Sequence, residues 1–541
     1  MRRVASVICV LGLASSLSAE DGHRHGQAGK PEELGRVDFA VSCSPRAQEQ
    51  FQVAVAMLHS FWYERTEGAF ADVAKTDPSC AMAYWGVAMS LWHPLWTPPD
   101  AATLQKGLAA AEKARALAPG DPRQRGFIDA IAAFYTDSDK VDHRTRALAY
   151  EHAMESLHAA FPQDDEVSAF YALALLATAP LTDKTYANQL KAAALLEPIF
   201  RAHPRHPGAA HYIIHSFDVP ALAPRALEAA RSYAKIAPSV PHALHMPSHI
   251  FTRLGLWQES IESNLASAAA AKLFAEESHM GGVWDEQLHA MDYLEYAYLQ
   301  RAEDRKAKDV VDQLAAIKSF AQRNAKAGYA VAAIPARYAV ERRAWSEAAG
   351  LQAPPFAVPW TEAIVRFARG YGLARLGDAP GARAEVDALA RIRDTLRAAR
   401  EAYWADQVEV QRLAVAAWAA HAAGRETEAL KLMTASADLE DSGEKLPVTP
   451  GPLVPARELL GELLLEADQP REAFYAFRVA LHDSPDRLGG LAGAARAASL
   501  AGDVAESQAY AARLDAVTAG GDGTRPALLE TRKLLVPAPK P

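Results

Sequence analysis

The sequence predicts an all-α solenoid of antiparallel helical hairpins, and three observations support this fold class. No run of alternating apolar and polar residues is long enough to build a sheet. Paired helical patterns of about 12–18 residues recur along the chain, joined by short breaks. With 541 residues, the chain is also too long for one compact core, because single domains usually hold about 100–200 residues. Length and pattern together are typical of a repeat array.

A fixed spacing of residues recurs within the helical pairs. A residue closes the first helix, a small residue follows five positions later in the second helix, and a further packing residue stands four positions beyond it. A proline often follows after eight more positions. The spacing occurs at Ala221, Ala226, Ala230 and Pro238; at Gly377, Ala382 and Val386; at Gly424, Ala429 and Met433; at Asp468, Ala473, Phe477 and Pro485; and at Gly502, Ser507 and Ala511. Small residues let two helices approach closely, and proline ends the second helix. This is the spacing of the tetratricopeptide repeat (TPR), so we expect a TPR-type solenoid wound as a right-handed superhelix.

Two motifs point to a narrower group within the repeat class. Residues 77–86 read Asp-Pro-Ser-Cys-Ala-Met-Ala-Tyr-Trp-Gly, and residues 242–251 read His-Ala-Leu-His-Met-Pro-Ser-His-Ile-Phe. The segments 41–96 and 206–300, which contain these motifs, resemble a family of uncharacterised bacterial exported TPR proteins. The resemblance is specific over these segments and generic beyond them. It implies the fold and export, and it supplies no activity.

Breaks in the helical pattern suggest how the chain is divided. A Pro-rich segment at 353–359 predicts a seam between an N-terminal solenoid over 45–352 and a C-terminal block over 360–518. The segments 20–44 and 519–541 lack the helical pattern, and we expect both to be flexible. The formal net charge of -9 argues against a nucleic-acid partner, which would require a basic face.

Residues 1–19 have the order of a secretory signal peptide. Arg2 and Arg3 precede an apolar stretch, and mostly small residues follow as far as Ala19. The alternative is a short N-terminal anchor helix. The body of the chain contains no apolar run of membrane-spanning length. The sequence therefore predicts a periplasmic or secreted protein that is not an integral membrane protein after cleavage.

Two cysteines, Cys43 and Cys80, remain after the predicted cleavage. In an oxidising compartment an even pair is a candidate disulfide, which would tie the entry segment to the start of the second repeat. The alternative is two unpaired buried thiols.

Histidines are concentrated in one part of the chain, where seven of the 18 fall between residues 203 and 249. His211 and His215 are four residues apart, so they share one face of a helix, and the same holds for His245 and His249. The two pairs are offset by 34 residues, which is the length of one TPR unit. The offset predicts that all four imidazoles converge from two consecutive first helices. One hypothesis is that they bind a divalent zinc, copper or iron ion. The alternatives are that they line the groove for a polypeptide partner or that they have a purely structural role.

The first helices of a TPR superhelix line its concave groove, so other residues on them are candidate ligand-binding groups. These are His59, His242, Arg253, His289, Asp292 and Tyr296. A curved repeat array offers a long inner surface that suits an extended ligand. The favoured hypothesis is accordingly an exported scaffold that binds a protein or peptide partner in its groove. The alternative is a metal-binding protein or metal-dependent enzyme built on the histidine pairs. No His-Glu-x-x-His motif, Gly-rich phosphate loop or nucleophile elbow is present, which favours a binding protein over an enzyme.

Overall fold

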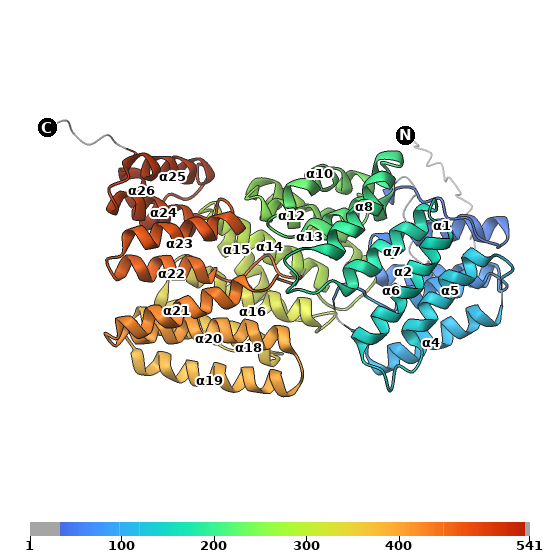
Figure 1. Ribbon diagram of the computed structural model, residues 1–541, viewed down its shortest axis with the longest axis horizontal. Helices are drawn as coiled ribbons and strands as arrows, with labels where there is room; N and C mark the ends of the chain where they lie inside the picture. The colour runs from blue at the N-terminus through green and yellow to red at the C-terminus, as the bar shows by residue number, and fades with distance from the viewer. Residues whose placement is uncertain (1–32, 97, 118, 447, 536–541) are drawn as a thin grey trace, which may run out of the picture.

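The computed structural model describes residues 33–96, 98–117, 119–446 and 448–535. Within these ranges the chain folds into successive antiparallel helical pairs with no strand, apart from one isolated bridge between Val283 and Phe320. The predicted all-α TPR-type solenoid is confirmed (Figure 1). The predicted signal peptide, residues 1–19, lies outside the described residues.

The helices alternate between a first and a second helix of each pair. In the N-terminal half they are α1 (Pro45–His59), α2 (Tyr63–Thr76), α3 (Ala81–Ser90), α4 (Ala101–Ala116), α5 (Pro122–Tyr135), α6 (His143–Ala160), α7 (Asp165–Thr178), α8 (Ala187–Ala202), α9 (Pro207–Phe217), the short 3₁₀ helix η2 (Ala223–Ala226), α10 (Leu227–Ile236), α11 (Pro241–His245), α12 (Pro247–Arg253) and α13 (Trp257–Glu277). In the C-terminal half they are α14 (Asp285–Gln300), α15 (Asp304–Ala316), α16 (Ala325–Glu341), α17 (Trp345–Ala349), α18 (Pro359–Arg375), α19 (Ala379–Ala398), α20 (Ala402–Ala422), α21 (Glu426–Asp441), α22 (Ala456–Glu466), α23 (Pro470–Asp483), α24 (Leu488–Leu500), α25 (Val504–Val517) and α26 (Pro526–Lys533).

The recurring sequence spacing has a direct structural cause. Gly424 and Gly502 close α20 and α24 with positive φ angles of 73° and 84°, a conformation that glycine adopts without steric cost. The small residues five positions later, such as Ala429, are fully buried between the two helices of a pair. α11 and α12 together form one first helix, which is interrupted at Met246 because Pro247 has no backbone N–H to donate.

First helices line the inside of the solenoid, and second helices lie outside. Every residue of α9 is buried, and so is every residue of α14 except Gln287. The second helices α10 and α15 bury only a single stripe. Residues on α9, α11, α12 and α14 are therefore enclosed by protein on all sides, which decides the environment of the histidines.

The segment before α1 runs along this inner surface. Phe39 is fully buried, and its ring contacts aromatic rings on four successive first helices, which are those of Phe51, Trp85, Phe127 and Phe170. Leu34 is fully buried as well, so this part of the segment is packed against the helices, and the flexibility expected over 20–44 stays a prediction.

Polar side chains and a disulfide hold the same segment. The Gln48 side chain donates to the Phe39 carbonyl at 2.9 Å and accepts from the Val41 amide at 2.7 Å. Cys43 and Cys80 form a disulfide with their Cα atoms 4.9 Å apart, as one of the two sequence alternatives predicts. The disulfide ties the segment to the start of α3.

A second irregular segment lies between α21 and α22 and also enters the interior (Figure 1). Its described residues are 443–446 and 448–455, and it is called segment 443–455 below. The Thr449 carbonyl accepts a hydrogen bond from Tyr293 on α14 at 3.0 Å, and the Gly451 carbonyl accepts one from Tyr329 on α16 at 3.2 Å. Both irregular segments therefore satisfy backbone groups against side chains of the first helices.

The C-terminal part of the chain contains one more helix. Residues 526–533 form α26, and Leu528 is buried. Arg525 pairs with Asp304, and the flexibility expected over 519–541 stays a prediction. The Pro-rich segment 353–359 is a loop that leads into α18, and buried residues on both sides of it belong to one hydrophobic cluster. The seam at this segment stays a prediction.

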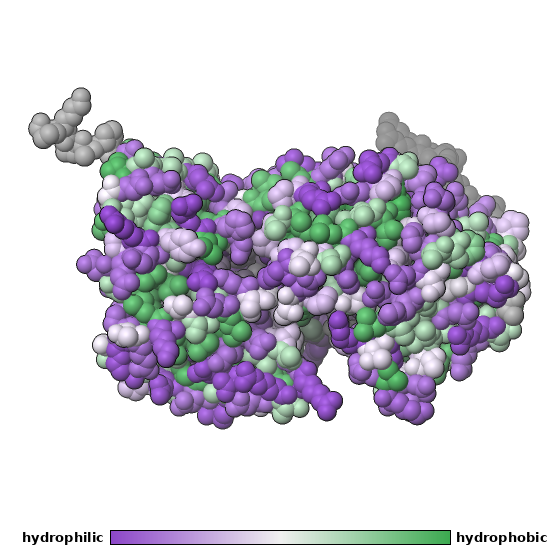
Figure 2. All heavy atoms as spheres, viewed as in Figure 1, coloured by the Kyte–Doolittle hydropathy of each residue, from purple (hydrophilic) through white to green (hydrophobic). Residues whose placement is uncertain are grey.

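The outer surface mixes hydrophilic and hydrophobic residues without one dominant patch on the face shown in Figure 2. That face is hollowed at its lower edge, between the end of α19 and the α4–α6 region. Among the described helices, none has both the length and the apolar character needed to cross a membrane.

Candidate metal centre

Six histidines come together inside the solenoid, from α9, α11, α12 and α14. They are His211, His215, His242, His245, His249 and His289, and each is at most 9% exposed. As the sequence predicts, the pairs on α9 and on α11–α12 come from consecutive first helices. Burial makes them interior groups and not the lining of an open groove.

The histidines divide into two groups of three instead of one group of four. The candidate ligand atoms of His245, His249 and His289 all lie within 4.8 Å of one another, and so do those of His211, His215 and His242. The prediction that His211, His215, His245 and His249 converge on a single point is therefore wrong. Each pair instead meets a third histidine, which is His242 in one group and His289 in the other. The sequence predicts both of these as ligand-binding residues of the groove.

In the first group, hydrogen bonds fix which nitrogen of each ring carries the proton. The Asn264 side chain donates from Nδ2 to the Ser260 carbonyl, so its Oδ1 faces His245 and accepts from Nδ1 at 2.7 Å. His249 Nδ1 donates to the Asp218 carboxylate at 2.9 Å. In their neutral forms, both His245 and His249 therefore present an unprotonated Nε2.

These two unprotonated Nε2 atoms face each other at 3.0 Å. Two lone pairs at this distance form no hydrogen bond, so the site needs either an extra proton or a cation between them. Burial lowers the pKa of His249 to about 4, which disfavours the extra proton near neutral pH. If a metal ion were bound about 2.0–2.1 Å from each Nε2 atom, the N–metal–N angle would be about 95°. This angle is within the range of protein metal sites.

Asp218 is the partner that orients His249, and two cations hold it. Arg253 donates to Oδ1 at 2.9 Å, and Lys445, from the segment 443–455, contacts Oδ2 at 3.0 Å. Burial by itself raises the pKa of Asp218, but the charges of Lys445 and Arg253 outweigh burial and hold the pKa well below its usual value. A carboxylate that fixes a histidine tautomer is the usual outer partner of a metal ligand.

The second group has a similar pair and one histidine without a hydrogen bond among the described residues. His211 Nδ1 donates to the His59 carbonyl at 2.6 Å, and its Nε2 lies 3.1 Å from His215 Nε2. Neither nitrogen of buried His242 has a hydrogen-bond partner among the described residues. Its Nδ1 lies 3.5 Å from Oε2 of Glu286, which is likewise buried and unpartnered.

A third cluster, built on His59, is complete without a metal. His59 Nε2 and His206 Nε2 both donate to Glu166, at 2.8 and 3.1 Å. Tyr212 donates to the other nitrogen of His59, and the Ala209 amide donates to the other nitrogen of His206. Because every ring nitrogen has a partner, this cluster is a satisfied hydrogen-bond network, and His59 has a structural role.

The other predicted groove residues make different contacts. Asp292 binds the buried Arg337 at 2.6 Å, together with Glu295. Tyr296 accepts from Arg487 at 2.7 Å, and Arg253 supports Asp218. None of these three side chains contacts a histidine of either group in a hydrogen bond or ion pair that the described residues show. Of these three, Arg253 alone contacts a residue that orients a histidine of the candidate metal centre, because it binds Asp218.

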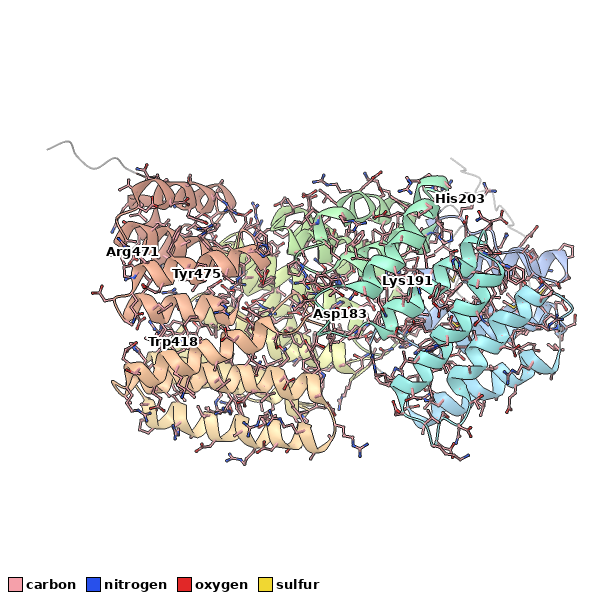
Figure 3. All side chains as sticks on the ribbon, in the orientation of Figure 1. Asp183, Lys191, His203, Trp418, Arg471 and Tyr475 are labelled. Atoms are coloured by element: carbon pink, nitrogen blue, oxygen red, sulfur yellow. A yellow bond between two sulfur atoms is a disulfide. The ribbon has the colours of Figure 1, made fainter. Side chains whose placement is uncertain are left out.

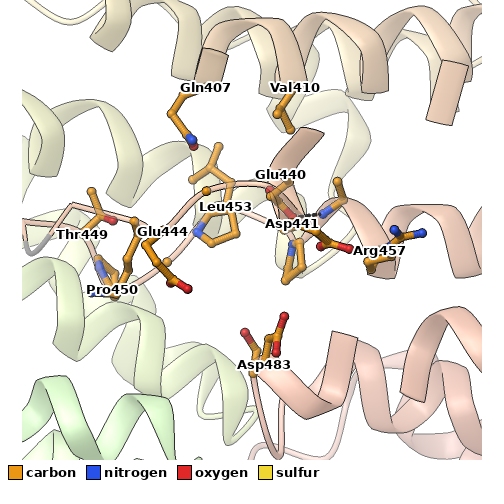
Figure 4. A pocket seen from close by; sticks show the side chains of 18 of the residues that line it. Gln407, Val410, Glu440, Asp441, Glu444, Thr449, Pro450, Leu453, Arg457 and Asp483 are labelled. Carbon is orange, nitrogen blue, oxygen red and sulfur yellow. Dashed lines mark hydrogen bonds and ion pairs between the residues drawn. The ribbon is translucent and has the colours of Figure 1, made fainter. Parts of the chain in front are cut away.

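A cavity of about 260 Å³ lies beside the segment 443–455 (Figure 4). Its wall includes the stacked rings of Trp360 and Trp404, 4.1 Å apart between centroids. Arg253 and Lys445 also line it, and both bind Asp218 on their other side. These two side chains therefore separate the cavity from His249. Figure 4 shows the acidic residues Glu440, Asp441, Glu444 and Asp483 around it.

Histidines outside the interior take no part in the centre. Figure 3 shows His203 at the outer surface, at the end of α8. Its side chain is 61% exposed and lies 3.1 Å from Asp165. It serves as a natural control for the buried rings.

Comparison with known proteins adds little to this description. No protein-family model and no curated protein matches the chain. Solved structures that match include a human IFIT1 dimer with PPP-AAAA, at a TM-score of 0.37 and 10% identity over 86% of this chain and 89% of that chain. Another is the human IFIT1 dimer with m7Gppp-AAAA, at a TM-score of 0.33 and 11% identity over 81% of this chain and 90% of that chain. At these values the likeness carries no argument about function.

Proposed function

We propose that this protein binds a divalent transition metal through His245, His249 and His289. One observation carries the proposal. The Nε2 atoms of His245 and His249 lie 3.0 Å apart, and neither carries a proton, because the ring proton of each histidine is on Nδ1 and is donated to Asn264 or Asp218. Imidazole suits zinc, copper and iron, and three histidines leave a fourth position for water or a small ligand. Asn264 and Asp218 supply the outer hydrogen bonds that such ligands require.

We further propose that the metal is bound after export. The N-terminal sequence is that of a signal peptide, and the disulfide between Cys43 and Cys80 suits an oxidising compartment. Fractionation of cells, followed by N-terminal sequencing of the mature chain, tests this assignment. A chain that begins near residue 20 in the periplasm or medium supports it, and an uncleaved cytoplasmic chain contradicts it.

Elemental analysis of the mature protein, purified without chelator and without a His-tag, tests the metal proposal. We expect at least one equivalent of zinc, copper or iron per chain, and one equivalent less when His245 and His249 are both changed to Gln. The variant His203→Ala is the matched control, because it removes an exposed ring and should retain the metal. Equal metal content in wild type and in the double variant, with helical content unchanged, would contradict the proposal.

A second candidate function, binding of a peptide in the cavity beside segment 443–455, has its own support. The inner surface already holds two extended segments of its own chain, 34–43 and 443–455, by side-chain bonds to backbone carbonyls. The cavity continues this surface and offers the stacked rings of Trp360 and Trp404. A peptide partner would therefore bind by the same kind of contacts that hold these two segments of the chain.

Selection from a library of random displayed peptides tests this candidate. We expect peptides that the wild type retains and that Trp404→Ala binds at least about 10-fold more weakly. Tyr475→Ala is the control, because Tyr475 on α23 is 70% exposed and does not line the cavity (Figure 3). Absence of enriched peptides, or equal binding by Trp404→Ala, would count against peptide binding.

A further inference from the structure

The histidines of the second group lack a complete set of hydrogen-bond partners. Among the described residues, both nitrogens of buried His242 and the Oε2 atom of Glu286 make no hydrogen bond, although His242 Nδ1 and Glu286 Oε2 lie 3.5 Å apart as an ion pair. A buried polar atom without a partner is destabilising, and His242 Nε2 is left with neither a hydrogen bond nor an ion pair. Lys326 binds the other oxygen of Glu286, so it does not fill this gap.

A neutral imidazole has one N–H donor and one lone pair, so Glu286 can accept from one nitrogen of His242 and a cation would satisfy the other. His211 has its proton committed to the His59 carbonyl, so its Nε2 is an electron-pair donor. His215 Nε2 lies 3.1 Å from it, and a nitrogen of His242 lies within 4.8 Å of both. The side chains around this point thus offer three imidazoles and one carboxylate, a ligand set that suits a divalent transition metal.

We propose that His211, His215 and His242 bind a second divalent transition metal ion, with Glu286 as the nearby carboxylate. This inference rests on the proposed function, since it makes the protein a carrier of two ions in adjoining sites. The rings of His215 and His249 have centroids 6.2 Å apart, and those of His242 and His245 are 6.3 Å apart. Two dications this close repel each other, so the second site fills at higher metal concentration than the first.

Each site has one carboxylate nearby. Asp218 lies beside the first site and pairs with Arg253 and Lys445. Glu286 lies beside the second site and pairs with Lys326. The third cluster, at His59, offers no comparable vacancy, because Glu166 already accepts from both His59 and His206.

Titration of the metal-depleted mature protein with Co²⁺, followed by visible absorption, tests the second site. We expect two equivalents per chain for the wild type, filled in two phases. The variant His215→Gln with His242→Gln should bind one equivalent, and so should the variant His245→Gln with His249→Gln. Circular dichroism checks that both variants keep their helical content.

The outcomes separate this inference from the proposed function. One equivalent in the wild type, kept by the His215 and His242 variant but lost by the His245 and His249 variant, overturns the second site and leaves the proposed function standing. No binding by any form overturns both. A single variant, Glu286→Gln, adds a check that needs no change in the histidines. We expect it to weaken only the second phase, and an unchanged second phase would remove Glu286 from the site.

Discussion

The side-chain amide of Asn264 carries much of the case for a metal. Its Nδ2 is committed to a backbone carbonyl, so its Oδ1 decides the tautomer of His245. Asp218 does the same for His249 with a charge. The two Nε2 atoms that face each other are therefore a consequence of second-helix and loop residues, and not of the His-x-x-x-His spacing alone.

The Asp218 carboxylate should control metal affinity without being a ligand. The variant Asp218→Asn removes the charge that orients and polarises His249, and we expect metal affinity to fall by about 10–100-fold. Competition with a chromophoric chelator measures this change. The exposed Asp139 provides a matched control, and Asp139→Asn should bind as the wild type does. Equal affinity of wild type and Asp218→Asn would show that Asp218 does not act on the metal.

Glu295 makes a separate prediction about pH. Burial raises the pKa of Glu295 to about 8, despite its contact with Arg337 at 2.9 Å. A carboxyl whose pKa is raised by folding stabilises the protein below its unfolded pKa, near 4.5, and this contribution is lost as the pH rises through 8.

The variant Glu295→Gln removes this pH-dependent contribution. We compare the free energy of unfolding of the variant with that of wild type at each pH. The difference, variant minus wild type, should be about 3–5 kcal/mol larger at pH 9 than at pH 5. Urea unfolding at both pH values measures the difference. Parallel pH dependence in the two proteins would show that Glu295 is ionised near neutral pH.

Contacts between residues close in sequence could be predicted from the sequence, and contacts between distant residues could not. The histidine pairs were predictable, because residues four apart on a helix share a face and a 34-residue offset repeats that face. Lys445 was not predictable, since it reaches Asp218 across 227 residues of sequence. Asn264 lies on a second helix, and no periodicity marks which of its polar residues points inward.

At the scale of elements, the extended segment 34–43 acts as part of the core. The ring of Phe39 contacts α1, α3, α5 and α7 through aromatic rings on each. Its sequence has no periodic pattern, which is why it was expected to be flexible. The helices around this extended segment stabilise it. These contacts are with residues distant in sequence, so the local sequence does not predict them.

Truncation of Phe39 tests this role. We expect Phe39→Ala to lower the free energy of unfolding by about 3–5 kcal/mol, as for other buried phenylalanines. Urea unfolding measures the change, and Asp38→Ala, at the adjacent exposed position, is the control with little effect. A loss below about 1 kcal/mol would mean that the segment is dispensable for the fold.

For the whole molecule, metal binding and stability are linked. The ligands of the first site come from α11, α12 and α14, and their outer partners come from the turn after α9, from α13 and from segment 443–455. Metal at about 100 times its Kd should therefore raise the free energy of unfolding by about 2.7 kcal/mol. Thermal unfolding with and without Zn²⁺ measures this, and EDTA should reverse it. A Zn²⁺-induced rise in Tm that is undiminished in the His245→Gln and His249→Gln double variant would contradict metal binding at the first site.

The overall architecture was the part most accessible from the sequence, because the TPR spacing repeats the same local packing at Ala382, Ala429 and Ala473. The sequence did not predict that segments of the chain itself fill the interior. The same first helices that were expected to leave an open groove enclose two segments of their own chain, and this follows only from how the pairs curve around them.

The most direct test of the account is a crystal of the mature protein grown with Zn²⁺ and measured at the zinc absorption edge. We predict an anomalous difference peak about 2.0–2.1 Å from Nε2 of both His245 and His249, with His289 as the third ligand. An ordered site with no anomalous peak, and with the two Nε2 atoms still about 3 Å apart, would mean that a shared proton fills the gap and that the metal proposal is wrong.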